Sequence, residues 1–139
     1  LNRIYSMENC NKILVIGAEN VGKSSILRHL CGEEEVELIE KTLGMQVHVG
    51  VDDNDDSRII EYYELGGSAA AFEEIAQTYI QTQNFDGIMA IFDLYNTKTI
   101  NTIYNILEIY HNASVGQHEA GIEEGFGGVD IPLQIIGNK

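Results

Sequence analysis

One short segment near the start of the chain has the spacing of a phosphate-binding loop. Residues 17–24, GAENVGKS, fit the pattern G-x-x-x-x-G-K-[ST] at every fixed position. In such a loop, backbone N–H groups and the positive end of a helix surround phosphates, Lys23 supplies a point charge, and the Ser24 hydroxyl can bind Mg²⁺. A glycine loop that only joins a strand to a helix is the alternative, and the complete motif argues against it. Glu19 should point to solvent, since a carboxylate repels phosphate.

More polar residues follow the loop at intervals that suit the same chemistry. Thr42 precedes two expected strands, and Glu64 ends the second of them, where a carboxylate can hold Mg²⁺ through water. Gly67, three residues on, can offer its N–H to a terminal phosphate. Asn138 and Lys139 directly follow the last expected strand, at the edge where open α/β sheets bind ligands. Each residue alone is ordinary, but their order after a phosphate loop favours function.

The elements that must position these residues are short strands alternating with helices, which predicts a sheet covered by helices. Continuously apolar runs predict buried strands, and alternating runs predict an antiparallel hairpin. The buried strands are expected at 12–16, 87–93 and 131–137, the hairpin at 45–51 and 58–64, and helices at 23–30, 68–82 and 96–110. Residues 112–130 are rich in glycine and acids and predict a surface insertion.

The length of the chain indicates a single domain, and its net charge argues against some binding partners. A chain of 139 residues suits one domain, and 44% hydrophobic residues are enough for a core. Eight Lys plus Arg against 22 Asp plus Glu give a net charge of −14, which opposes binding to nucleic acid or an anionic membrane but permits a local phosphate site. Two cysteines and the lack of a long apolar run predict a cytoplasmic protein with reduced thiols.

Three weaker features have ordinary explanations. The acidic run at 52–56 could be mistaken for a calcium loop, but it lacks the spaced ligands and is better read as a solvated turn. The four histidines show no pairing or clustering with acids or cysteines, so they are expected to be surface or packing residues. Tyr62 and Tyr63 could form a partner-binding face or simply stabilise the hairpin.

Taken together, these motifs resemble the small GTPases of the Ras and Rab superfamily, most closely the Rab-like protein three group. The resemblance rests on the runs 21–25, 30–31, 64–68, 131–133 and 136–139. It implies an α/β fold, the P-loop NTPase G-domain: a three-layer sandwich with a mostly parallel sheet and one antiparallel hairpin edge strand. Residues 1–139 would then form a domain incomplete at its C-terminus, lacking the last strand and helix, with a surface insertion at 113–130.

The resemblance also implies roles for individual residues, with GTP or GDP and Mg²⁺ as cofactors. Nucleotide-binding positions would be Asn20, Val21, Gly22, Lys23, Ser24, Ser25, Thr42, Gly67, Asn138 and Lys139. Of these, Asn138 and Lys139 resemble the opening of the family's guanine-recognition motif Asn-Lys-x-Asp, so they would contact the base. Metal-binding positions would be Ser24, Thr42 and Glu64, and the positions that contribute to catalysis would be Lys23, Thr42 and Ser68.

Two departures from the family pattern shape the functional prediction. Glu64 replaces an aspartate, and Ser68 replaces the glutamine that orients the attacking water. We therefore expect a Mg²⁺-dependent molecular switch whose GTP hydrolysis is slow or depends on a partner. A pseudo-GTPase scaffold with a degenerate switch is the alternative, and an ATP-dependent enzyme would need machinery that the sequence lacks. Effector and regulator proteins at the switch regions are the expected partners, with no nucleic acid, no visible membrane anchor and a homodimer left open.

Overall fold

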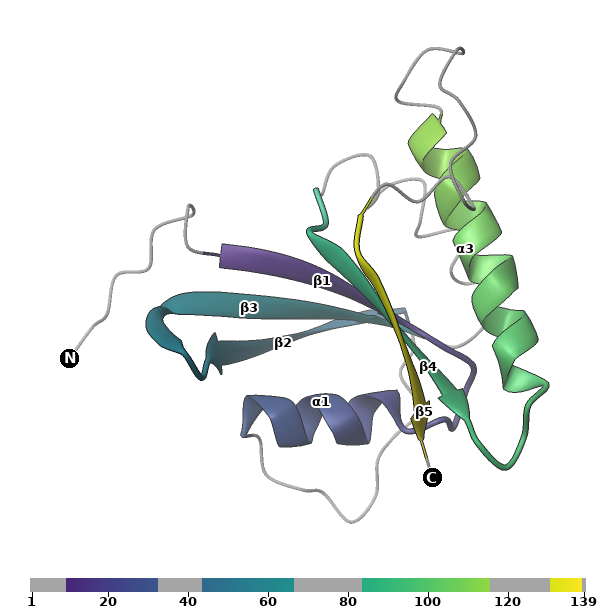
Figure 1. The fold of residues 1–139 in the computed structure, drawn as a ribbon, viewed down its shortest axis with the longest axis horizontal. Helices are drawn as coiled ribbons and strands as arrows, with labels where there is room; N and C mark the ends of the chain where they lie inside the picture. The colour runs from purple at the N-terminus through teal and green to yellow at the C-terminus, as the bar shows by residue number, and fades with distance from the viewer. Residues whose placement is uncertain (1–9, 33–43, 67–83, 116–130, 139) are drawn as a thin grey trace.

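The computed structural model describes residues 10–32, 44–66, 84–115 and 131–138. These residues form five strands and two helices in the order that the sequence pattern predicts (Figure 1). The elements are β1 (Cys10–Ile16), α1 (Lys23–Cys31), β2 (Met45–Asp52), β3 (Asp55–Leu65), β4 (Gly87–Asp93), α3 (Thr99–Val115) and β5 (Leu133–Asn138). The helix expected at 68–82 lies outside the described residues.

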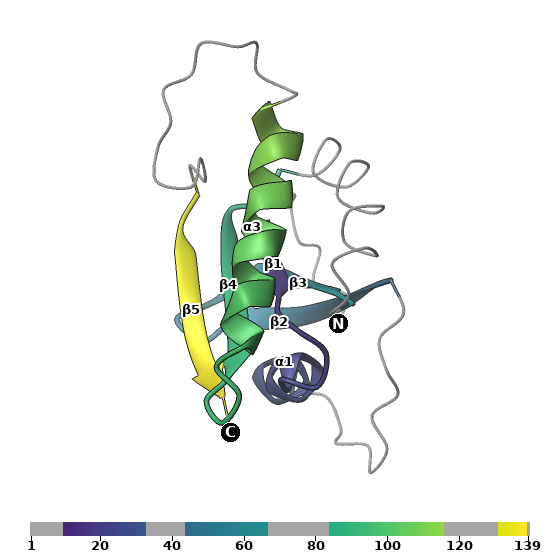
Figure 2. The same ribbon diagram turned by 90° about the vertical axis from the view of Figure 1, so that its right-hand side faces the viewer.

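The strands form one sheet in the order β2-β3-β1-β4-β5. β1 pairs in parallel with β3 and β4, and β4 with β5, whereas β2 runs antiparallel to β3 at the edge. α1 lies on one face of the sheet and α3 on the other (Figures 1 and 2). This confirms the three-layer α/β architecture, and it brings the carboxyl ends of four parallel strands to one edge.

Each face of the sheet has its own apolar core, which explains why β1 is apolar at successive positions. Val15 points toward α1, where it packs with Val21, Leu27 and Ile91. Its neighbours along the strand point toward α3, because side chains alternate along a strand. That second core contains Leu14, Ile16, Tyr63, Leu65, Phe85, Ile88, Ala90, Ile103, Ile106 and Tyr110.

The boundaries of two elements differ from the sequence prediction. β3 begins at Asp55 and not at Arg58, because the hairpin turn is short and the Asn54 N–H donates to Asp52 Oδ1 at 2.9 Å. α3 begins at Thr99 and not at Asn96, since the Thr99 hydroxyl donates to Asn96 O at 2.7 Å and accepts from the Asp93 N–H at 2.9 Å, which fixes a turn there.

The segment 113–130, expected to be a surface insertion, is described only in part. α3 continues to Val115, so the backbone of the first three of these residues is helical. Residues 116–130 lie outside the part of the chain that the structure describes.

The prediction that the last strand is buried is wrong. Within the described sheet β5 pairs only with β4, so it lies at an edge. Leu133 and Ile135 are 39% and 54% exposed. An apolar run shows that a strand is present, but it does not distinguish an edge strand from a central one.

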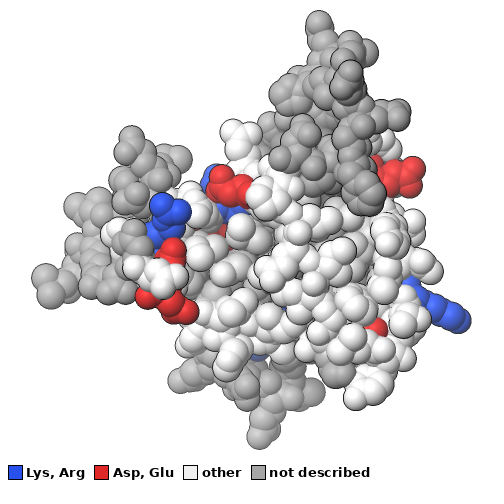
Figure 3. Space-filling model, viewed as in Figure 1, with Lys and Arg blue, Asp and Glu red and all other residues white. Residues whose placement is uncertain are grey.

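Charged side chains are sparse on the described part of one face of the molecule (Figure 3). On the face shown in Figure 3, acidic and basic side chains stand in small separate groups, and most of the described surface in view is uncharged. Neither α1 nor α3, the helices that the structure describes, is both long enough and apolar enough to cross a lipid bilayer.

Candidate phosphate and metal site

The loop from β1 to α1 takes a shape that requires glycine. Gly22 has φ +96°, a left-handed conformation, and a Cβ there would overlap Nδ2 of Asn138. A Cβ on Gly17 would likewise overlap the carbonyl oxygen of Ile91. α1 begins directly after Gly22 with no side-chain cap and no acid in its first turn. The amino end of this helix therefore presents backbone N–H groups and a positive dipole, as anion binding requires.

Lys23 folds back over the loop that precedes it. Its Nζ donates to Gly17 O at 2.8 Å and to Ala18 O at 2.7 Å, and the residue is 6% exposed. Burial lowers the pKa of Lys23, while the negative charges of Glu64 and Glu19 act in the opposite direction. The ammonium group is thus held at the loop by two carbonyls.

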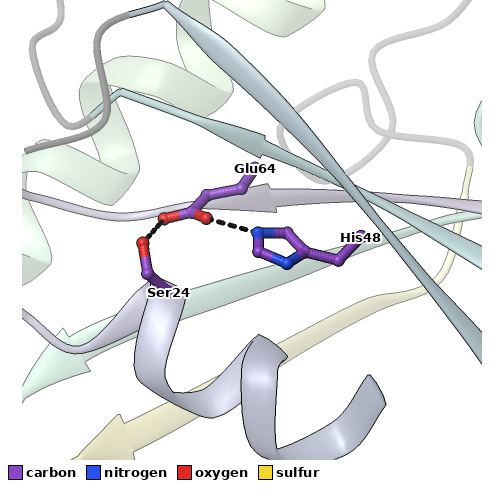
Figure 4. A network of polar contacts seen from close by, with 3 residues as sticks. All are labelled: Ser24, His48 and Glu64. Atoms are coloured by element: carbon purple, nitrogen blue, oxygen red, sulfur yellow. Dashed lines mark hydrogen bonds and ion pairs between the residues drawn. The ribbon is translucent and has the colours of Figure 1, made fainter. Parts of the chain in front are cut away.

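Ser24 and Glu64 meet beside the loop, although they are far apart in the sequence. The Ser24 hydroxyl donates to Oε1 of Glu64, and Oε2 of Glu64 lies 2.8 Å from Nε2 of His48 (Figure 4). Glu64 is 1% exposed and His48 is fully buried. Parallel pairing sets Glu64 beside Val15, two residues before the phosphate loop begins at Gly17. Two of the three metal-binding residues expected from the sequence are therefore in contact.

The donor set of this contact fits Mg²⁺. Mg²⁺ prefers hard oxygen donors, and it usually takes one or two protein oxygens while water and substrate phosphates complete the shell. A hydroxyl and a carboxylate supply such oxygens here. No group of three or more His, Cys, Asp or Glu side chains suited to a metal occurs among the described residues.

Asn138 joins the last described strand to the phosphate loop. Its Nδ2 donates to Val21 O at 2.9 Å, and its own carbonyl accepts from the Leu94 N–H at 3.0 Å. The amide expected to contact the base thus lies against the loop expected to contact the phosphates.

Some of the remaining predicted site residues lie in the part of the chain that the structure describes, and others lie outside it. Glu19 is exposed, as expected, and so are Asn20 and Ser25. Thr42, Gly67, Ser68 and Lys139 lie outside the described residues. The Gly66 N–H donates to Gly44 O at 2.6 Å, which joins the residue before β2 to the residue after β3.

His48 is the residue that sequence reasoning missed. We expected it to be a surface or packing histidine without acidic neighbours, and the structure places it against Glu64. The signal was in the hairpin register. His48 lies opposite Tyr62 and Gln46 lies opposite Glu64, so His48 and Glu64 share a face as diagonal neighbours.

Tyr63, one of the two adjacent tyrosines on β3, belongs to the core of the fold. Tyr63 is 8% exposed and stacks edge-on against Phe85, so it stabilises the core. Its hydroxyl donates to Oε2 of Glu61 at 2.6 Å, and Oε1 of Glu61 accepts from Sγ of Cys10 at 2.9 Å. These contacts lie on the α3 side of the sheet, away from the phosphate loop.

Comparison with known proteins identifies relatives of the chain. Residues 12–117 match the family model described as "Ras of Complex, Roc, domain of DAPkinase". The chain is 29% identical to Rab-like protein 3 of Mus musculus, 30% to that of Bos taurus and 29% to that of Homo sapiens. Each alignment covers 92% of this chain and 60% of the relative, so the chain spans about 60% of the length of these proteins.

Proposed function

Because this chain belongs to the Ras of Complex family of Ras-like GTPase domains, within the Ras and Rab superfamily, we propose that it binds GTP and GDP with Mg²⁺ and acts as a molecular switch. The observation that carries the proposal is the bond from Asn138 to Val21, which joins the expected base-recognition residue to the phosphate loop. The nucleotide would lie along the edge of the sheet where β1, β4 and β5 end.

Each part of the described site has a task in this proposal. The amino end of α1 and the Lys23 ammonium bind the phosphates. The Ser24 hydroxyl and the Glu64 carboxylate would hold Mg²⁺, directly or through water, and the metal when bound neutralises phosphate charge. Thr42 and Gly67 would sense the terminal phosphate, and their segments would order with GTP and relax with GDP.

Slow or partner-dependent hydrolysis is part of the proposal. Ser68 stands where the family template places a water-orienting glutamine, and a serine side chain is too short to replace it. Effector and regulator proteins would then bind near Thr42 and Gly67 in the cytoplasm.

Isothermal titration calorimetry tests the nucleotide assignment. In Mg²⁺ buffer, GDP should bind with micromolar or tighter affinity, and ATP should bind far more weakly. Lys23→Ala should abolish GDP binding, because it removes both the charge and the two bonds that hold the loop. Arg58→Ala removes an exposed cation at the opposite end of the sheet and serves as the control. Tight ATP binding without GDP binding would overturn the proposal.

A pseudo-GTPase scaffold is a second candidate, favoured by one observation. Glu64 is already hydrogen-bonded to Ser24, so two of the three expected metal donors satisfy each other. Single-turnover GTP hydrolysis, measured with and without cell lysate, separates the candidates. A rate stimulated by lysate supports the switch, whereas bound GTP that persists unchanged in both conditions supports the scaffold.

A further inference from the structure

We propose that His48 is a positioning residue that holds the Glu64 carboxylate on Ser24 and thereby sets the affinity of the site for Mg²⁺. The inference rests on the proposed function, since it assigns a task to a residue outside the expected nucleotide and metal sets. Its ligand class is a divalent cation bound together with a nucleoside diphosphate.

The two oxygens of Glu64 face two different partners. Oε1 accepts from the Ser24 hydroxyl at the start of α1, and Oε2 lies 2.8 Å from Nε2 of His48 on β2 (Figure 4). A carboxylate can only accept hydrogen bonds, so the His48 ring donates through a proton on Nε2. The carboxylate is fixed at both ends, which sets its orientation as well as its position.

Packing holds the His48 ring in place. The imidazole is fully buried on the face of the sheet that α1 covers. Two residues further along the same face, Gly50 is buried beside α1, and a Cβ there would lie in van der Waals contact with Sγ of Cys31, at 3.4 Å. The donor therefore comes from a rigid strand under a helix and not from a mobile surface side chain.

Glu64 needs this restraint more than a shorter acid would. Glutamate has one more rotatable bond than aspartate, and fixing such a side chain opposes its rotamer entropy. The Lys23 ammonium lies within electrostatic reach of Glu64 and would attract a released carboxylate. While His48 is hydrogen-bonded to Oε2 of Glu64, Oε1 remains beside the Ser24 hydroxyl, the other described donor of the expected Mg²⁺ site. Partners in the outer shell orient metal ligands in this way, and their loss typically lowers metal affinity by about 10- to 100-fold.

The test measures how much Mg²⁺ the full-length protein needs to retain a fluorescent GDP analogue. His48→Leu keeps the volume but removes the donor, and it should raise the Mg²⁺ midpoint by about tenfold or more. His48→Gln places an N–H donor near the position of Nε2 and should restore the midpoint to within about threefold of wild type. Val49→Ala, at an exposed neighbour on the same strand, should leave the midpoint unchanged.

A double variant separates positioning from general stability. If His48 acts through Glu64, His48→Leu should shift the midpoint little once Glu64→Gln is present. Equal shifts in both backgrounds, or a His48→Leu protein with a lowered melting temperature but a normal midpoint, would overturn the inference while leaving GDP binding intact. A wild-type protein that binds no GDP would instead overturn the proposed function, and the inference with it.

Discussion

The side-chain amide of Asn138 donates to the backbone carbonyl of Val21 across 2.9 Å, and this bond joins two segments separated by 117 positions in the sequence. It connects the end of β5 to the phosphate loop that follows β1. Gly22, the next residue, has no Cβ, and the Asn138 amide occupies the place that a Cβ would take. Loop shape and amide position therefore depend on each other.

Removing the Asn138 amide should loosen the phosphate loop. Asn138→Ala leaves the Val21 carbonyl without this donor and should destabilise the fold by about 1 kcal/mol. A free energy of about 1 kcal/mol corresponds to roughly a fivefold change in an equilibrium constant. The GDP dissociation constant should rise by more than this factor, since the expected base contact is lost as well. Urea unfolding and GDP titration measure the two effects. Gln134→Ala, at an exposed position on the same strand, is the control, and an equal change in both variants would contradict the prediction.

Two left-handed glycines should respond differently to alanine. Gly32 has φ +68° and open space around it, so Gly32→Ala should destabilise by about 1–2 kcal/mol through backbone strain alone. Gly22→Ala adds a clash with Asn138, so it should destabilise further and reduce GDP affinity at least tenfold. Urea unfolding gives the loss of stability of each variant, and GDP titration gives its affinity for the nucleotide. Normal GDP binding by Gly22→Ala would show that the Asn138 contact does not matter.

Cys10 should be an unreactive thiol in the folded protein. Burial, followed by the hydrogen bond to Glu61 and the charge of that carboxylate, raises the pKa of Cys10 to about 11. Because the thiolate is the reactive form, iodoacetamide at pH 8 should modify Cys10 about a hundredfold more slowly than in the urea-unfolded chain. Glu61→Gln removes the charge and should speed the reaction, as site-resolved mass spectrometry can show. Similar rates in the folded and unfolded chains would refute the assignment.

Acid stability should depend on Tyr63 through its bond to Glu61. Hydrogen bonds from Cys10 and Tyr63 lower the pKa of Glu61. The Glu61 carboxylate is therefore protonated more readily in the unfolded chain than in the folded protein. The resulting stabilisation is present above the ordinary carboxyl pKa of about 4.3 and is lost as the pH falls through the lowered value.

Tyr63→Phe should therefore lose stability at neutral pH and show a shallower decline between about pH 6 and pH 3. Tyr95→Phe is the matched control, because Tyr95 is 86% exposed. Urea unfolding across this pH range is the measurement, and parallel curves for wild type and Tyr63→Phe would contradict the assignment.

Much of the fold could be predicted from local patterns. Continuous apolar runs identified β1 and β4, alternation identified the hairpin, and helical spacing identified α1 and α3, because each pattern reflects the environment of a single element. Burial of β5 was predicted wrongly for the described sheet, where β5 pairs only with β4, since burial depends on which elements lie beside a strand and not on the strand itself. The start of α3 moved to Thr99 because a local turn competes with the helix.

By itself, the sequence determined the phosphate loop, its place between a buried strand and a helix, and the residues that follow it in order. These are properties of spacing, which the chain carries whether folded or not. Only the tertiary structure decided that Lys23 turns back onto its own loop, that Asn138 reaches Val21, and that a buried histidine holds Glu64. Those contacts depend on strand register and on which face each side chain takes, and both are set when the sheet assembles.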